Sequence, residues 1–534
     1  MKRNLLLAIL SGLLLGFSWP TYGFAILLFI GFVPLLFVEN SFRKHPVKRS
    51  GTKLFGLTYL TFLLFNSIST WWLWYASKFG MFFAIGVNSL LMTLVFFIYH
   101  KVALKTTQKK ALFFLIVFWI SFEKFHLNWD FSWPWLNLGN GFSLNHKWIQ
   151  WYEYTGIFGG TLWIWLVNIG IFLALKKYSN NSDTKQLIRG LLINVLIVII
   201  GIYTSLYIYH SYKINSQGYT NVVLLQPNVD PYTEKYNISN LKTAKNLIAQ
   251  AEEVIDSTTN FIIAPETTFA NPVLQGNYAK AQSYKLLKSF TKKHPNINFI
   301  AGYTFYKQYK SFNQPTPTAN KFRNAQNSWY DMYNSAAFIN AENKPQIYYK
   351  SKLVVGVELF PYKNILQPIL GDALLNLGGT IASLGTQNIR TVFKTNNQNV
   401  APIICYESIY GEYINGFVRN GANFLAVITN DGWWQNSQGH KQHLMLSKLR
   451  AIENRRSLVR AANTGVSAVI NQKGDIIKHL DYGVKGLIKA TVPLNNEKTF
   501  YNSYGDYIAR LAQFLSILLF LTIFLRKRTN INDL

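Results

Sequence analysis

The chain contains a single cysteine, Cys405, which directly follows the short apolar run "VAPII". A thiol at the end of a strand can be displayed on a sharp turn, as nucleophiles often are. A lone cysteine is more often a small buried hydrophobic side chain. Tyr406 and Glu407 come next and suit an apolar core poorly, so they favour a reactive thiol. One cysteine also excludes an intrachain disulfide and a cysteine-rich zinc site.

Two charged residues elsewhere stand in contexts that suit a reactive site. Glu266 follows the run "FIIAP", which places it at the carboxyl end of an expected strand, where ligand sites of α/β domains collect. A carboxylate that caps a following helix would have the same context. Lys350 follows two tyrosines in "QIYYK", a context more usual for a solvated lysine. A thiol and a carboxylate brought together would act as nucleophile and general base.

All three residues lie within 218–496, where short β-type runs alternate with helical patterns. The β-type runs are "NVVLLQPN", "FIIAPET", "NFIAGYTF", "SAAFIN", "VAPIICYE", "FLAVITND" and "SAVINQKGD". The helical patterns cover 238–255, 278–294 and 441–456. This alternation predicts a layered α/β domain. The polar, Pro- and Asn-rich stretch 307–330 is expected to be a long surface loop.

The rest of the chain is apolar enough to span a membrane repeatedly. Hydrophobic residues make up 49% of the sequence and charged residues only 14%, against about 25% charged in a typical soluble domain. A bilayer core needs about 20 apolar residues in a helix. The runs that approach this length are 4–20, 23–39, 54–76, 80–99, 110–126, 157–175, 188–208 and 507–525. Lys and Arg outnumber Asp and Glu by 53 to 24, and many flank these runs, which favours a membrane protein over a nucleic-acid binder.

Basic residues cluster in every second connection between the apolar runs. Clusters of Lys and Arg occur at 2–3, 43–53, 101–110, 176–189 and 526–528. The intervening short connections carry almost none, so the positive-inside rule places both termini in the cytoplasm. We therefore expect a membrane domain at 1–208 with about seven spans, an extracytoplasmic domain at 209–506, and a last span with a basic cytoplasmic tail at 507–534.

The three site residues, taken in chain order, resemble the Glu-Lys-Cys triad of the nitrilase superfamily. The glutamate follows an apolar strand and a proline, the lysine has a "YxK" context, and the cysteine stands in "ICYE". The stretches "YNSAAFIN", "TNDGWW" and "AIENRRSLVRAANTGVSAVINQKG" strengthen the resemblance, which covers about 220–495. With "WPWLNLGN" and "WYEYTGIFGG" in the membrane half, the chain is similar to the bacterial apolipoprotein N-acyltransferase family. The resemblance implies a polytopic α-helical membrane domain of about eight spanning helices and an extracytoplasmic αββα sandwich.

The resemblance also implies a role for each residue of the triad. Cys405 would be the nucleophile, Glu266 the general base, and Lys350 the ammonium that faces the tetrahedral oxyanion. A backbone N–H near Tyr406 would join Lys350 at the oxyanion. We also expect Lys350 to lower the pKa of Cys405 by favouring the thiolate.

Three further residues match positions of the family. Glu358 lies eight residues after Lys350, and Glu407 lies two residues after Cys405. Both are expected to hold the lysine and the cysteine loop in place. The chain reads "LVVGVE" where the family commonly reads "LVPFGE", so the resemblance predicts no backbone geometry at Glu358. Trp433, in "NDGWW", is expected either to contact lipid or substrate or to pack as a core indole.

The resemblance implies an enzyme of the bacterial inner membrane. It would transfer an acyl chain from a membrane phospholipid, through a thioester on Cys405, to the N-terminal amine of the diacylglyceryl-cysteine of an apolipoprotein. No cofactor and no nucleic acid are implied, a monomer is expected, and no metal is expected because His440 and His443 lack an evident third ligand.

Two alternatives differ in class. A membrane-anchored amidase acting on small amides would need only one span. A non-catalytic transporter or scaffold would need an ion or substrate pathway, for which the spans carry few internal charges.

Overall fold

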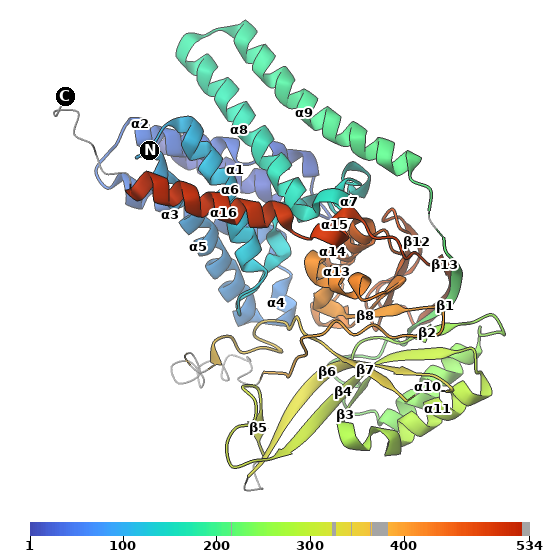
Figure 1. Ribbon diagram of the computed structural model, residues 1–534. Coiled ribbons are helices and arrows are strands. Elements are labelled where there is room, and N and C mark those ends of the chain that lie inside the picture. Colours follow the sequence, from blue (N-terminus) through green and yellow to red (C-terminus); the bar gives the residue numbers. More distant parts are fainter. Residues whose placement is uncertain (215, 323–326, 343, 364, 366–382, 526–534) are drawn as a thin grey trace. The chain divides into compact units, whose positions relative to one another are not determined.

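The computed structural model describes residues 1–214, 216–322, 327–342, 344–363, 365 and 383–525 (Figure 1). The chain divides into two compact units. The first, here called the helical unit, comprises Met1–Trp71, Met81–Ser211 and Tyr504–Leu534. The second, here called the α/β unit, comprises Trp72–Gly80 and Tyr212–Ser503.

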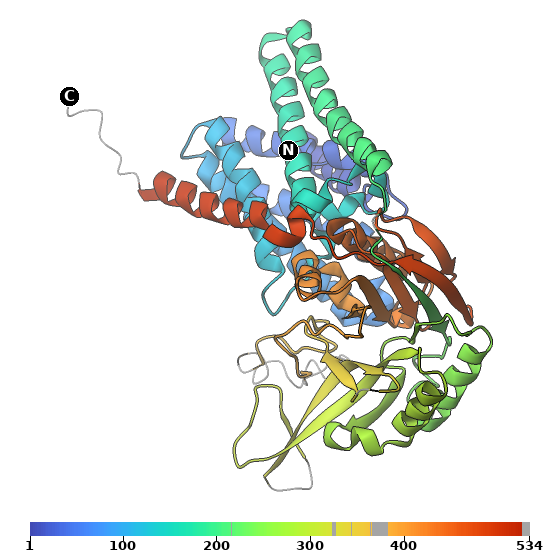
Figure 2. The same ribbon diagram turned by 45° about the vertical axis from the view of Figure 1, so that its right-hand side comes forward.

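The helical unit consists of long apolar helices. Its main helices are α1 (Lys2–Gly16), α2 (Val33–Lys44), α3 (Ser50–Thr70), α5 (Lys78–Ala103), α6 (Gln108–His126), α8 (Ile157–Asn181), α9 (Thr184–Ser211) and α16 (Tyr507–Leu525). Shorter helical turns are η1 (Ala25–Phe29), η2 (Pro134–Leu136), η3 (Leu138–Phe142), η4 (His146–Trp148) and α7 (Tyr152–Thr155). Helices α8 and α9 run side by side in both views (Figure 2).

Several of these helices suit a membrane. Among the described residues, five segments are long and apolar enough to cross one: Ala25–Lys44, Lys78–Ala103, Ile157–Asn181, Thr184–Ser211 and Tyr507–Leu525. Each of the predicted apolar runs lies largely in a helix, but α1 has only 15 residues and α3 and α6 are not among the five. The number of spans therefore stays a prediction. The basic residues predicted after the last helix, 526–528, lie outside the described residues.

The charged end of the run 110–126 is accommodated inside the helical unit. The Nζ atom of Lys124 lies 2.8 Å from Oδ2 of Asp506, just before α16. The carboxylate of Glu123 accepts hydrogen bonds from the backbone N–H of Leu138 (2.8 Å) and the hydroxyl of Thr161 (2.7 Å). Both charges are thus matched by partners, so α6 can end in them without leaving the packed unit.

The α/β unit contains two sheets. The eight-stranded sheet has the order β13-β1-β2-β4-β6-β5, with β3 paired to β4 and β7 to β6. Its strands are β1 (Tyr219–Gln226), β2 (Phe261–Ile263), β3 (Phe269–Leu274), β4 (Asn298–Lys310), β5 (Asn320–Lys321), β6 (Ser328–Ile339), β7 (Gln346–Tyr349) and β13 (Gly486–Pro493). The five-stranded sheet has the order β12-β11-β10-β9-β8. Its strands are β8 (Val400–Ile404), β9 (Phe424–Thr429), β10 (Leu458–Ala462), β11 (Ser467–Ile470) and β12 (Ile476–Leu480).

Helices cover the outer face of each sheet. The helices and turns of this unit are α4 (Leu73–Ala76), α10 (Asn240–Glu252), η5 (Gln275–Lys280), α11 (Gln282–Lys293), η6 (Cys405–Ile409), α13 (Gly411–Arg419), η7 (Asp431–Trp434), α14 (Gln438–Asn454) and α15 (Phe500–Tyr504). Helices α10 and α11 bury Leu247, Leu287 and Phe290 in one core with β1, β2, β4 and β6. Helices α13 and α14 contact β8 and β10.

The inner faces of the two sheets pack on each other. The rings of Phe261 on β2 and Phe424 on β9 lie 5.3 Å apart and edge to face, and both side chains are fully buried. The result is the αββα sandwich that the sequence predicts. Its strands read as continuous apolar runs because they are buried on both faces.

Each of the predicted β-type runs forms a strand, and each predicted helical pattern forms a helix. The surface loop expected at 307–330 is wrong at both ends. Strand β4 continues to Lys310, and β6 begins at Ser328 and pairs with it antiparallel. Aromatic residues such as Tyr309 and Trp329, which face each other across the ladder, favour strand over loop.

Candidate active site

Cys405 is the first residue after β8 and begins the short helix η6. Its φ angle is +49°, in the left-handed region that non-glycine residues rarely occupy. Its side chain is 7% exposed. The sharp turn expected at the end of this strand is therefore present. Strain of this kind persists only when the surrounding structure holds it in place.

A buried polar cluster holds the cysteine turn from behind. The Nε2 atom of His443 on α14 lies 3.2 Å from the backbone oxygen of Cys405 and 3.0 Å from Oγ of Ser408. The Nδ1 atom of His443 lies 3.1 Å from Oδ1 of Asp431, and Arg460 donates to Oδ2 of Asp431 at 2.6 Å. We call these five residues the elbow cluster. None of its hydrogen-bonding side chains is appreciably exposed.

Glu266 and Lys350 meet at one edge of the eight-stranded sheet. Glu266 follows β2 and Lys350 follows β7, and these two strands run in the same direction. The Lys350 ammonium donates to Oε1 of Glu266 at 3.0 Å and to Oε1 of Glu358 at 2.9 Å. All three side chains are largely buried, with Lys350 only 1% exposed.

Asn334, which sequence reasoning did not single out, bridges the two carboxylates. Its Nδ2 atom donates to Oε1 of Glu266 and to Oε1 of Glu358, each at 2.8 Å. Its backbone oxygen accepts from the N–H of Lys350 at 2.9 Å. The other oxygen of Glu266 accepts from the N–H of Asn430 at 3.1 Å. The available signal was the polar pair in "YNSAAFIN", which stands directly before the apolar run "AAFI" of the same strand.

Burial and charge together fix the protonation of this group. Burial raises the pKa of the Cys405 thiol, and the nearby Glu266 carboxylate raises it further; Lys350 acts in the opposite direction and is outweighed. Lys350 lowers the Cys405 pKa, as expected, but burial and Glu266 raise it by more. Burial alone would raise the pKa of Glu266, but Lys350 and the Asn334 hydrogen bond lower it overall. Burial disfavours the charged form of Lys350, yet Glu266 and Glu358 raise its pKa well above the usual range.

Glu407 ties the cysteine turn to the lysine loop. Its carboxylate accepts hydrogen bonds from the N–H of Ile404 at 2.8 Å and from the N–H of Ser351 at 2.7 Å. The hydroxyl of Tyr348 donates to it at 2.5 Å. Since Ile404 precedes the cysteine and Ser351 follows the lysine, one buried carboxylate sets the separation of the two loops. Burial raises the pKa of Glu407, and these hydrogen bonds oppose that effect.

The remaining predicted residues are placed as follows. Glu358 closes its own turn, because its Oε2 accepts from the N–H of Val354 at 2.9 Å, and Gly356 supplies a φ of +80° there. Tyr406 is buried in η6, with its ring centroid 5.4 Å from that of Tyr410. Trp433 is half-buried and packs edge to face on Tyr232, which donates to its backbone oxygen.

The thiol and two neighbouring side chains are of the residue types that bind metal ions. One ligand atom each from Cys405, Asp431 and His443 lie within 4.8 Å of one another, a combination that the sequence pair His440 and His443 did not indicate. The Arg460 guanidinium already contacts two of these groups, since its Nη2 atom lies 2.6 Å from Asp431 and 2.9 Å from Nδ1 of His443. A second cation would lie against that guanidinium, so these residues do not fit a metal ion.

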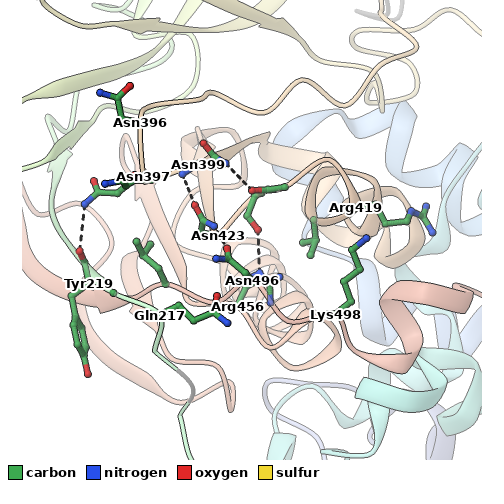
Figure 3. Close-up of a pocket in the computed structure, with 16 residues that line it drawn as sticks. Gln217, Tyr219, Asn396, Asn397, Asn399, Arg419, Asn423, Arg456, Asn496 and Lys498 are labelled. Carbon is green, nitrogen blue, oxygen red and sulfur yellow. Dashed lines mark hydrogen bonds between the residues drawn. The ribbon is translucent and has the colours of Figure 1, made fainter.

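Of two cavities in the α/β unit, one is lined by a residue of the candidate site and the other is not. A small cavity of about 70 Å³ reaches Glu266 and is also lined by Lys235, Thr268 and Asn463. A larger one of about 820 Å³ includes Asn399 before β8 and so lies at the opposite edge of the sheet from the cysteine. Figure 3 shows its asparagine side chains together with three cationic ones, Arg419, Arg456 and Lys498. None of the predicted site residues lines it, so size does not mark the site of chemistry here.

Both halves of the chain match families of known proteins. Residues 224–500 match the family model for carbon-nitrogen hydrolase, and residues 11–170 match that for the apolipoprotein N-acyltransferase N-terminal domain. The apolipoprotein N-acyltransferase of Chlorobaculum tepidum is 28% identical over 99% of this chain and 98% of its own length. That of Geobacter metallireducens is 25% identical over 95% of this chain and 93% of its own. A solved structure, Nit3 of Saccharomyces cerevisiae, a member of branch 10 of the nitrilase superfamily, aligns with 53% of this chain and 92% of its own at 16% identity and a TM-score of 0.36.

The two sheets, the covering helices and the Glu-Lys-Cys grouping define the class of the α/β unit, which is a carbon-nitrogen hydrolase domain. The match of the helical half, with relatives that span almost the full length, narrows this further. The chain belongs to the apolipoprotein N-acyltransferase family.

Proposed function

We propose that this chain transfers an acyl chain from a membrane phospholipid to the N-terminal amine of the diacylglyceryl-cysteine of an apolipoprotein. One observation carries the proposal. The single thiol stands on a strained turn beside a buried Glu-Lys pair, in a chain whose helical half matches the acyltransferase family as well. An anchored amidase would not need that helical half.

The first half-reaction forms a thioester. As the Cys405 sulfur attacks the ester carbonyl carbon, its proton passes to Glu266. The Lys350 ammonium stabilises the resulting oxyanion, with a backbone N–H near Tyr406. The ester C–O bond then breaks, and Glu266 returns the proton to the departing lysophospholipid oxygen. Because the thiol pKa is raised and the Glu266 pKa lowered, the proton stays on sulfur until the ester is present.

The second half-reaction uses the same groups in reverse. The acceptor amine attacks the thioester carbonyl carbon and gives a proton to Glu266. The C–S bond breaks, and that proton restores the Cys405 thiol. Glu358 and Glu407 hold the lysine and cysteine loops, and Trp433 contacts lipid or substrate. Neither step calls for a cofactor.

The reaction requires that the α/β unit reach lipid. The alternation of basic connections supports about eight spans in the bacterial cytoplasmic membrane, with both termini in the cytoplasm. Residues 209–506 then form the extracytoplasmic catalytic domain between membrane segments 1–208 and 507–534. One copy of the chain supplies every group that the reaction uses, so the proposal needs no second copy.

Intact-mass measurement tests the chemistry directly. Purified protein incubated with phospholipid and no acceptor should gain the mass of one acyl chain, and hydroxylamine should remove it. Cys405→Ser should abolish both the gain and the transfer to an apolipoprotein peptide. A serine variant that transfers at the normal rate would overturn the proposal. Since the chain has one cysteine, no other thiol can account for the adduct.

A further inference from the structure

Lys235 is a second buried lysine next to the Glu-Lys-Cys grouping. It lies in the turn after β1, and its side chain is 6% exposed. Its ammonium contacts the hydroxyl of Thr267 and lies 3.4 Å from the backbone oxygen of Glu266. Thr267 has a φ of +45°. Lys235 therefore holds the strained segment that carries the Glu266 carboxylate.

In the described part of the chain, Lys235 makes no ion pair with a carboxylate, and the two oxygens that its ammonium contacts are neutral. Burial lowers the pKa of Lys235 to about 8, while the charges of Glu266 and a Cys405 thiolate favour its protonated form. A buried charge without a partner is costly, and such groups cluster at functional sites.

Besides Lys235, the charged groups near the thiol are Glu266, Glu358, Lys350 and the mutually neutralising pair of Asp431 and Arg460. Glu266 and Glu358 carry two negative charges, and Lys350 between them carries one positive charge. This set has a net charge of −1, which opposes a further negative charge on the sulfur or on an oxyanion. Lys235 brings the sum to zero. The charges of Glu266, Lys350 and a Cys405 thiolate all act on Lys235, and Lys485 lines the same small cavity as Lys235 and Glu266.

We propose that Lys235 is a positioning residue whose buried charge offsets the excess negative charge around Cys405 and keeps the thiol reactive. The inference rests on the proposed role of Cys405 as nucleophile. It can still be tested without any lipid, because alkylation of the single cysteine reports thiolate formation directly.

Three variants of the full-length protein in detergent separate charge from hydrogen bonding. Lys235→Gln removes the charge and keeps a donor, whereas Thr267→Val keeps the charge and removes an acceptor. Lys448→Gln is the matched control, because Lys448 on α14 is also buried and burial also lowers its pKa to about 8. The rate of Cys405 alkylation by iodoacetamide at pH 7.5, followed by intact mass, should fall about tenfold in Lys235→Gln, as for one unit of pKa. It should change less than about twofold in the other two.

The outcomes are distinct. An unchanged rate in Lys235→Gln, or an equal loss in Thr267→Val, overturns the role of the charge. If Lys235→Gln does not fold, the wild-type protein decides. Its alkylation rate should rise less than tenfold per pH unit above about pH 8, where Lys235 loses its proton, and a constant tenfold rise overturns the proposal. Absence of a lipid-derived thioester, with the alkylation effect intact, would overturn the acyltransferase chemistry and leave the role of Lys235 standing.

Discussion

The two sides of the site are held by different forces. On the five-stranded sheet, the thiol stands on a turn fixed by hydrogen bonds within the elbow cluster, and the ion pair of Asp431 with Arg460 lies behind that turn. On the eight-stranded sheet, the Glu266 carboxylate is held by the Lys350 ammonium and by Asn334. The first arrangement fixes where the sulfur lies, and the second fixes where the proton lies. A change on one side should therefore alter a different property from a change on the other.

The largest expected effect comes from Glu266→Gln. It removes the general base, so acyl transfer should fall by about 100- to 10,000-fold. The same change removes a negative charge that raises the pKa of Cys405, so alkylation of the thiol at fixed pH should become faster. Transfer assays and alkylation rates on one preparation measure both. Slower acyl transfer together with faster alkylation is expected only if the carboxylate acts through its charge and through proton transfer.

Glu252→Gln is a suitable control, because Glu252 is an exposed residue at the end of α10. It should leave both rates unchanged. If Glu266→Gln slowed alkylation and transfer alike, the electrostatic account of this side would be wrong.

Asp431→Asn should act on stability first. It leaves the Arg460 guanidinium, which is fully buried, without its carboxylate, a change that typically costs about 3–5 kcal/mol. A clear drop in the thermal midpoint in detergent should result. Arg460 and His443 lower the pKa of Asp431 against the opposing effect of burial, so the ion pair adds stability above about pH 4 and loses it as the pH falls further. The difference in thermal midpoint between Asp431→Asn and the wild type should therefore become smaller in acid. A larger difference there would contradict the stabilising role of the ion pair.

The contrast between the two sides also explains what could be predicted from the sequence. Cys405, Glu266 and Lys350 each follow a strand, so an apolar or aromatic run followed by a polar residue identifies them locally. Asp431, His443 and Arg460 come from η7, α14 and β10, and only the fold brings them together. No local pattern encodes such a meeting.

The strands also divide into those that a local sequence pattern identifies and those that it does not. The strands predicted from sequence are mostly continuous apolar runs, such as β8 and β9. Strands β3, β5, β7, β12 and β13 were not predicted, because β5 has two residues and the others are partly exposed and contain polar residues. Strand β10 was not predicted because the charge of Arg460 breaks its apolar run. In the structure, Arg460 is fully buried and paired with Asp431.

Asn334→Ala should have an intermediate effect on the charged side. It removes hydrogen bonds to Glu266 and Glu358, each worth roughly 1–3 kcal/mol when an ionised acceptor is involved. The Asn334 bond lowers the pKa of Glu266, so its loss should raise that pKa. The acidic limb of the pH–rate profile for transfer should then move to higher pH. Unmoved pKa values with a lower melting midpoint would mean that Asn334 only supports the fold.

Ser447→Ala should have the smallest effect, on the hydrogen-bonded side. Oγ of Ser447 lies 2.9 Å from Oγ of Ser408 and donates to the backbone oxygen of His443 within its own helix. Ser408 keeps its contacts with His443 and with the Cys405 oxygen, so the turn stays fixed. A loss of about 1 kcal/mol in stability is expected, with alkylation and transfer rates within about twofold of wild type. A large loss of transfer with normal alkylation would mean that this serine reaches the proton-transfer side, and the division of labour between the two sheets would fail.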